Sequence, residues 1–119
     1  MAFVEQREEI LFVVFGKDKV KPGQEANSYV VEEGKAVEGL VEKIRDSATY
    51  KKVYQLRVKG VDKPLVMTGK TGLVEQMGHG EKLVEPVKEG DLVRITYLGM
   101  FKTGKGKDAY NLRVEVDRN

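Results

Sequence analysis

Residues 91–118, DLVRITYLGMFKTGKGKDAYNLRVEVDR, contain two runs in which apolar and mostly polar residues alternate. The first run extends from Val93 to Tyr97 and the second from Tyr110 to Val116. Successive side chains of a strand point to opposite faces, so each run predicts a strand with one apolar face. The segment Lys102–Lys107 between them holds two glycines and three lysines. Together these features predict a long β-hairpin with a basic turn.

The bulk composition limits what the chain can be. Its 119 residues suffice for one domain with its own core. It has no cysteine and a single histidine, His79, which excludes disulfides, thiolate metal sites and histidine clusters. No apolar run approaches the roughly 18 residues of a membrane helix. We therefore expect a cytoplasmic protein with no cofactor and no membrane partner.

The formal net charge is only +2, but positive charge gathers in two blocks. Residues 1–42 carry five bases and nine acids, and residues 75–91 carry two bases and five acids. In contrast, residues 43–59 carry six bases against one acid, and residues 94–113 carry five against one. If the fold brings the two basic blocks together, they form a patch that attracts a polyanion. The alternative is two separate solvated faces.

The first third of the chain is the least regular. The run Ile10–Phe15 is rich in β-branched and aromatic residues and predicts a buried strand, although periodicity also fits a short helix. Residues 16–27 read as a loop, and Ser28–Val31 as a short strand. We expect residues 1–33 to be an extension with strand character, packed on the main domain. A dimer arm and a cover over the binding groove are the alternatives.

The middle of the chain predicts three strands and a helix. Residues 35–46 fit either a helix or a strand bent at Gly39, and we prefer the strand because the alternating segment 51–59 needs a partner. Residues 65–68 form a third strand candidate. Residues 71–77 have helical spacing and end at Gly78, since glycine suits the left-handed position after a helix.

The order strand, strand, strand, short helix, strand, strand from residue 36 is that of an OB-fold, a small Greek-key barrel. We therefore expect a mostly β protein with a five-stranded OB-fold barrel over residues 34–119 and one short helix between its third and fourth strands. Such barrels bind ligands over the middle strands and two loops. Those loops map to residues 46–51 and 102–107, so the two basic blocks are expected on the two sides of one groove.

Several short motifs in residues 34–118 resemble the single-stranded-DNA-binding OB proteins of phages and prophages. They are Glu38-Gly-Leu-Val-Glu-Lys-Ile-Arg45, Tyr54-Gln-Leu-Arg-Val58, Thr68-Gly69, Gly90-Asp-Leu-Val-Arg-Ile-Thr-Tyr-Leu-Gly99, Lys105-Gly-Lys107 and Leu112-Arg-Val-Glu-Val-Asp117. Relatives of this kind often carry an aromatic residue where this chain has Thr68. The resemblance implies sequence-independent binding of single-stranded DNA in replication or recombination.

Such binding needs cations along the phosphates and aromatic faces that stack on bases. Two aromatic residues at loop edges, Tyr50 and Phe101, are the candidate stackers, although Phe101 can equally fold back onto the barrel. Tyr54, Tyr97 and Tyr110 share phase with core residues and are expected to pack inside. The candidate phosphate contacts are Arg45, Lys51, Lys52, Arg57, Lys59, Lys70, Arg94, Lys102, Lys105, Lys107 and Arg113.

Other motifs carry no chemistry. Thr68-Gly-Lys-Thr71 resembles the end of a P-loop, but Pro64 stands where its first glycine is required. We expect His79 to be an exposed loop residue and the acidic side chains between Glu81 and Asp91 to form a solvated edge. No nucleophile is paired with a base, so we expect no enzyme.

Three functions remain open. The first is single-stranded DNA binding. The second is a protein-interaction or structural OB module, because OB folds serve many functions. The third is RNA binding through the same groove, and a homodimer through residues 1–33 is compatible with all three.

Overall fold

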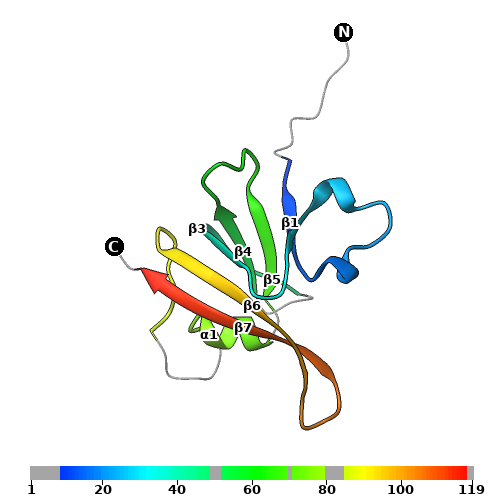
Figure 1. The fold of residues 1–119 in the computed structure, drawn as a ribbon. Helices are drawn as coiled ribbons and strands as arrows, with labels where there is room; N and C mark the ends of the chain where they lie inside the picture. Colours follow the sequence, from blue (N-terminus) through cyan, green and yellow to red (C-terminus); the bar gives the residue numbers. More distant parts are fainter. Residues whose placement is uncertain (1–8, 49–51, 70, 80–84, 118–119) are drawn as a thin grey trace.

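The computed structural model describes residues 9–48, 52–69, 71–79 and 85–117. Seven strands form one sheet in the order β2-β1-β5-β4-β3-β6-β7, which curls into a half-barrel (Figure 1). The strands are β1 (Leu11–Phe15), β2 (Ser28–Val31), β3 (Ala36–Asp46), β4 (Lys52–Arg57), β5 (Leu65–Gly69), β6 (Leu92–Lys102) and β7 (Asp108–Asp117). The helical segments are short: η1 (Lys17–Lys19), η2 (Glu25–Asn27) and α1 (Thr71–Gln76).

The prediction of a mostly β, barrel-like fold is confirmed. The sheet has seven strands. Five of them are the strands expected from residue 36 onward, and the two strands predicted for the N-terminal extension, β1 and β2, join the same sheet. β1 pairs in parallel with both β2 and β5. The sheet therefore continues across the expected boundary near residue 34.

β3 is a strand, as we predicted in preference to a helix for residues 35–46. It bends, so that it pairs with two neighbouring strands. Its first half, from Ala36 to Leu40, pairs with β6, and its second half pairs with β4. At Gly39 a Cβ atom would come within 2.9 Å of the Arg57 carbonyl oxygen. The absence of a side chain there lets the two backbones approach at the bend.

The interior of the half-barrel is filled by the alternating apolar residues of the strands and by α1. The ends of the curl meet through aromatic rings: Phe15 of β1 lies 5.7 Å from both Tyr97 of β6 and Tyr110 of β7, between ring centroids. These contacts join strands that lie far apart in the sheet order. The fully buried side chains include Val37, Val41, Tyr54, Leu56, Leu65, Val74, Met77, Val87, Val93 and Ile95.

α1 ends as predicted. Gly78 has a φ of 83°, and the His79 N–H donates to the Val74 carbonyl at 3.0 Å, the pattern of a Schellman motif. The helix lies against β7 (Figure 1). The Gln76 side chain accepts a hydrogen bond from the Val114 N–H at 3.0 Å and donates to the Leu112 carbonyl. It therefore occupies part of the outer edge of β7.

Candidate functional site

A groove of about 1120 Å³ opens between β1, β5 and the β6–β7 hairpin. β1 pairs with β5 only at Leu11 and Phe12, so the groove begins where this pairing ends. Apolar and basic side chains share its walls. The lining residues are Val13, Val14, Phe15, Lys19, Lys21, Met67, Thr68, Leu73, Met100, Phe101, Thr103, Gly104, Lys105, Lys107, Asp108, Ala109, Tyr110 and Leu112.

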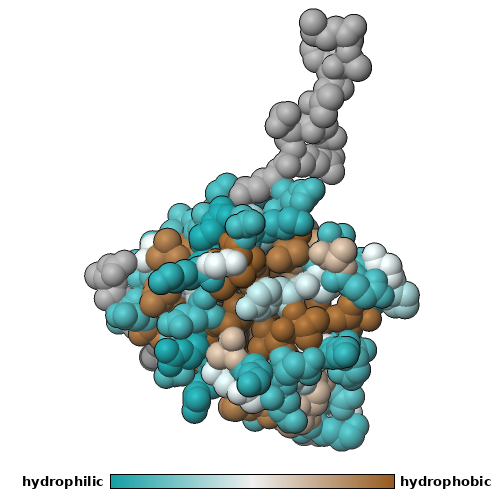
Figure 2. Space-filling view, turned by 45° about the horizontal axis from the view of Figure 1, so that its top comes forward, coloured by the Kyte–Doolittle hydropathy of each residue, from teal (hydrophilic) through white to brown (hydrophobic). Residues whose placement is uncertain are grey.

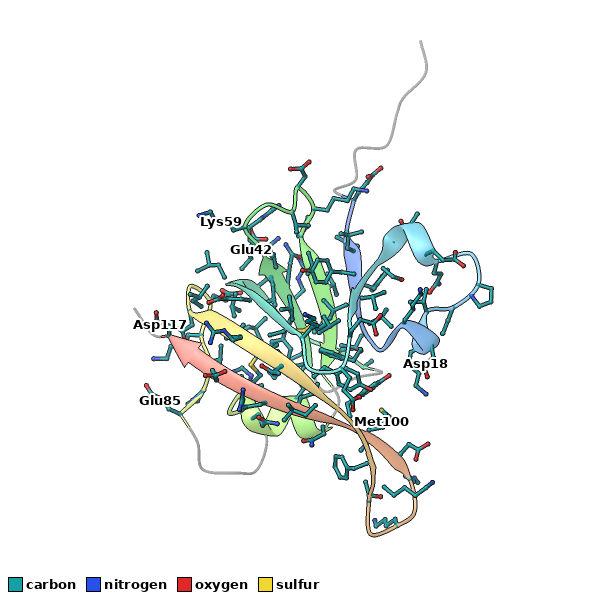
Figure 3. All side chains as sticks on the ribbon, in the orientation of Figure 1. Asp18, Glu42, Lys59, Glu85, Met100 and Asp117 are labelled. Carbon is teal, nitrogen blue, oxygen red and sulfur yellow. The ribbon has the colours of Figure 1, made fainter. Side chains whose placement is uncertain are left out.

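A β-bulge sets the direction of the hairpin wall. The pairing of β6 with β7 shifts register between Tyr97 and Met100, and Gly99 in this interval has a φ of 99°. Bulges bend a strand and increase its twist. Met100 marks the point where the hairpin leaves the body of the sheet (Figure 3). The bulge thus brings the last residues of β6 and the turn to the groove.

The turn of the hairpin is organised by Thr103. Its Oγ1 accepts hydrogen bonds from the backbone N–H groups of Lys105 and Lys107, both at 3.3 Å. Its own N–H donates to the Lys107 carbonyl at 2.8 Å, and Gly106 supplies the positive φ of 75°. Among the described residues neither lysine has an ion-pair partner, so both ammonium groups are available to an anionic ligand. Lys102, in contrast, pairs with Asp108 at 3.3 Å.

The opposite basic wall comes from a segment that the charge count did not select. Lys19 and Lys21 follow β1 and line the groove, and Lys19 makes only a long contact of 3.9 Å with the exposed Asp18 carboxylate. Residues 1–42 are acidic in sum, which concealed this local group. The alternation of Lys17, Lys19 and Lys21 in the sequence was the signal that could have revealed it.

The groove also presents aromatic and thioether surface. Phe101 is 49% exposed and Met100 39% exposed, although both line the groove. Phe101 therefore does not fold back into the core. Tyr97 and Tyr54 are buried, as predicted, and Tyr110 is half-buried against Phe15. Apolar surface gathers between hydrophilic side chains on one face of the molecule (Figure 2).

Three predicted arginines lie outside the groove, in ion pairs with neighbouring strands. Arg57 pairs with Glu42 at 3.2 Å. Arg94 lies 3.5 Å from Glu38 and 3.9 Å from Glu115, and Arg113 lies 3.8 Å from Glu115. Their charges are matched by carboxylates on the face of the sheet, so they offer less to a polyanion than unpaired lysines do.

The described members of the first basic block do not line the groove either. Lys52 pairs with Asp46, and its hydrogen bond and charge hold the pKa of that carboxyl below its ordinary value. Lys52 is in register with Gly69, next to Thr68 of the groove wall, whereas Lys59 lies on the opposite side of the molecule from Met100 (Figure 3). Arg45 is exposed on β3. Tyr50, Lys51 and Lys70 lie outside the described residues.

The prediction for His79 was wrong. Its ring is half-buried; Nδ1 lies 2.9 Å from the Tyr54 hydroxyl and Nε2 lies 2.9 Å from the Val87 carbonyl oxygen. A carbonyl only accepts, so Nε2 carries the proton and Nδ1 accepts the Tyr54 hydroxyl proton. Burial raises the pKa of Tyr54, which keeps this hydroxyl protonated. His79 is therefore a structural residue.

Two carboxylates of the predicted solvated acidic edge have structural roles instead. Asp91 is buried and accepts a hydrogen bond from the Lys88 N–H at 2.9 Å. Glu89 accepts one from the Ile44 N–H at 3.0 Å, close to the register shift of β3. These two carboxylates satisfy backbone donors instead of forming a solvated charge cluster.

Comparison of the chain with protein-family models, with curated proteins and with solved structures found no match. Within the described ranges, no group of three or more histidine, cysteine, aspartate or glutamate side chains could hold a metal ion. No helix in this part of the chain has the length and hydropathy needed to cross a bilayer. The groove is therefore the feature of the molecule that bears on its function.

Proposed function

We propose that this protein binds single-stranded DNA without sequence preference, as a non-catalytic cytoplasmic protein of replication or recombination. The observation that carries this proposal is the groove, whose lining includes Lys19, Lys21, Lys105, Lys107 and the exposed Phe101. Within the described part of the chain Lys105 and Lys107 have no ion-pair partner. Lysines neutralise phosphates and release counterions, and an aromatic face stacks on any base. The groove thus supplies both requirements of sequence-independent binding.

The topology from residue 36 onward supports an OB-fold assignment. β3 bends to pair with both β4 and β6, a helix follows β5, and the chain ends in the β6–β7 hairpin. An OB-fold is a partly open five-stranded barrel of this order. On this assignment, β1 and β2 extend the sheet beyond the barrel, and the hairpin turn is one of the two ligand-binding loops.

The test is fluorescence anisotropy of labelled oligo-dT, oligo-U and a duplex at low and high salt, with the variant Lys105→Glu/Lys107→Glu. We expect tight, salt-sensitive binding to dT over duplex, weakened at least about tenfold by the double reversal, equivalent to about 1.4 kcal/mol. The oligo-U arm distinguishes an RNA binder that uses the same groove.

The matched control is Lys59→Glu/Lys88→Glu, which changes the net charge equally through two exposed lysines outside the groove. It should retain wild-type affinity. Equal weakening by both double variants would show that binding follows overall charge and not this groove. If the wild type binds no strand at low salt, the proposal fails.

A protein-interaction module is the second candidate. The observation that favours it is the exposed apolar part of the groove, which is formed by Met100 and Phe101. A peptide could cover this surface without a phosphate backbone. If the correctly folded protein binds neither oligo-dT nor oligo-U, the result would favour a protein-interaction module.

A further inference from the structure

The curled sheet ends in two edge strands, β7 and β2. The edge of β7 is occupied near Leu112 and Val114 by the Gln76 side-chain amide. β2 ends the sheet on the other side, and in the described part of the chain no strand pairs with its outer edge. An uncovered edge strand is a template for another strand.

The hydrogen bonds around β2 identify which backbone groups face outward. The Val31 carbonyl accepts from the Gly16 N–H at 2.9 Å, so the peptide groups of Val31 face β1. Successive residues of a strand alternate in this respect, so the N–H and C=O groups of Val30 face away. Ser28 donates its N–H to Glu25, and Glu32 uses its carbonyl for the Lys35 N–H. The Ser28 carbonyl and the Glu32 N–H remain on the outer side.

The outer face of the sheet beside this edge is apolar. Leu11, Phe15 and Val31 contribute to the core, so the alternate residues Phe12 and Val30 point to the opposite face. Phe12 is 46% exposed and Val30 36% exposed. Val14 is in register with Val30, and Val66 with Phe12, so these four side chains form one continuous patch that reaches the free edge.

We propose that a second copy of this chain pairs with β2, antiparallel about a two-fold axis through Val30. This register exchanges two hydrogen bonds between Val30 and Val30 of the partner subunit. It adds two more between each Glu32 N–H and the Ser28 carbonyl of the partner subunit. Every outward-facing group is thus matched to its complement, as an isologous interface requires.

The apolar side chains agree with the same register. Residues directly opposite in an antiparallel pair share a face, so the two patches of Phe12, Val14, Val30 and Val66 become continuous. Val14 of this patch also lines the groove, so the interface and the groove adjoin at this residue. The dimer does not depend on the proposed function.

The test is sedimentation velocity of the full chain over a concentration series up to about 0.1 mM, a range that detects Kd values of micromolar order. We expect the wild type to dimerise. Val30→Lys places two ammonium groups on the axis, and Val30→Glu places two carboxylates there, so each variant alone should be monomeric. An equimolar mixture of the two should restore the dimer, because the introduced ammonium group of one chain then meets the introduced carboxylate of the other.

The matched control is Leu40→Lys, a change at an equally exposed leucine on β3, which should dimerise as the wild type does. Circular dichroism checks that each variant is folded. A monomeric wild type at the highest concentration would overturn the proposal, and so would a mixture of Val30→Lys and Val30→Glu that stays monomeric. Binding of oligo-dT is also measured for Val30→Lys. Val30 does not line the groove, so a monomeric variant that still binds oligo-dT shows that the dimer and the DNA-binding groove are independent.

Discussion

At the scale of single residues, the contact of Tyr54 with His79 ties three parts of the chain together. Tyr54 is a fully buried residue of β4, His79 follows α1, and Val87 belongs to the segment that leads into β6. The two rings also stack at a centroid distance of 5.7 Å. The pair therefore fixes the end of α1 and the following segment against the sheet.

Replacement of His79 by alanine should destabilise the protein by about 1–3 kcal/mol, because the Tyr54 hydroxyl remains buried without its acceptor. Tyr54→Phe removes the hydroxyl itself, so the double variant should lose less than the sum of the two single variants. Urea denaturation of the four proteins measures this coupling. Strictly additive losses would contradict a contribution from the hydrogen bond.

Among single residues, burial could be predicted from the sequence, but long-range contacts could not. Burial of Tyr54 and Tyr97 was predictable, since alternation along a strand is a local property. The role of His79 was not, because its partner lies 25 residues away and its glycine neighbours suggest a loop. The ion pairs of Arg57 and Arg94 likewise depend on strand register, which a single run of sequence does not contain.

At the scale of elements, the β6–β7 hairpin forms one wall of the groove. Both strands, the turn and its basic character were predictable from alternation and from the glycines of residues 102–107. The bulge at Gly99 was not predicted, although an interior glycine in a strand is its usual sign. Gly99 is buried, as Val93, Ile95 and Tyr97 are, whereas Phe101 is exposed, so the alternation of β6 ends just after the bulge.

Gly99→Ala should destabilise the protein by about 1–3 kcal/mol, because alanine rarely adopts a positive φ. The added Cβ would also collide with the Glu33 carboxylate, whose side chain must then move. Thermal unfolding measures the loss, and oligo-dT anisotropy of the folded fraction tests whether the hairpin is displaced. Gly104→Ala is the control, since it has open space around it and no positive φ. Equal stability of the two variants would contradict a structural role for the bulge.

At the scale of the whole molecule, the curl of the sheet decides which charges meet. The mostly β architecture and the order of its last five strands follow from the sequence pattern. The insertion of β1 beside β5 does not, because a parallel pairing between residues 11–12 and 65–66 leaves no local signal. Lys19 and Lys21, which follow β1, line the groove, whereas the described basic residues of 43–59 do not.

The salt dependence of DNA binding tests this arrangement of the two walls. Each phosphate neutralised on a single strand contributes about −0.7 to the slope of log K against log salt concentration. Four groove lysines therefore predict a slope of about −3 for oligo-dT. Lys19→Gln/Lys21→Gln and Lys105→Gln/Lys107→Gln should each reduce its magnitude by about 1.4, and the quadruple variant should nearly abolish it. Lys59→Gln should leave the slope unchanged. If Lys19→Gln/Lys21→Gln also leaves it unchanged, the DNA contacts only the hairpin, and the N-terminal wall has no part in binding.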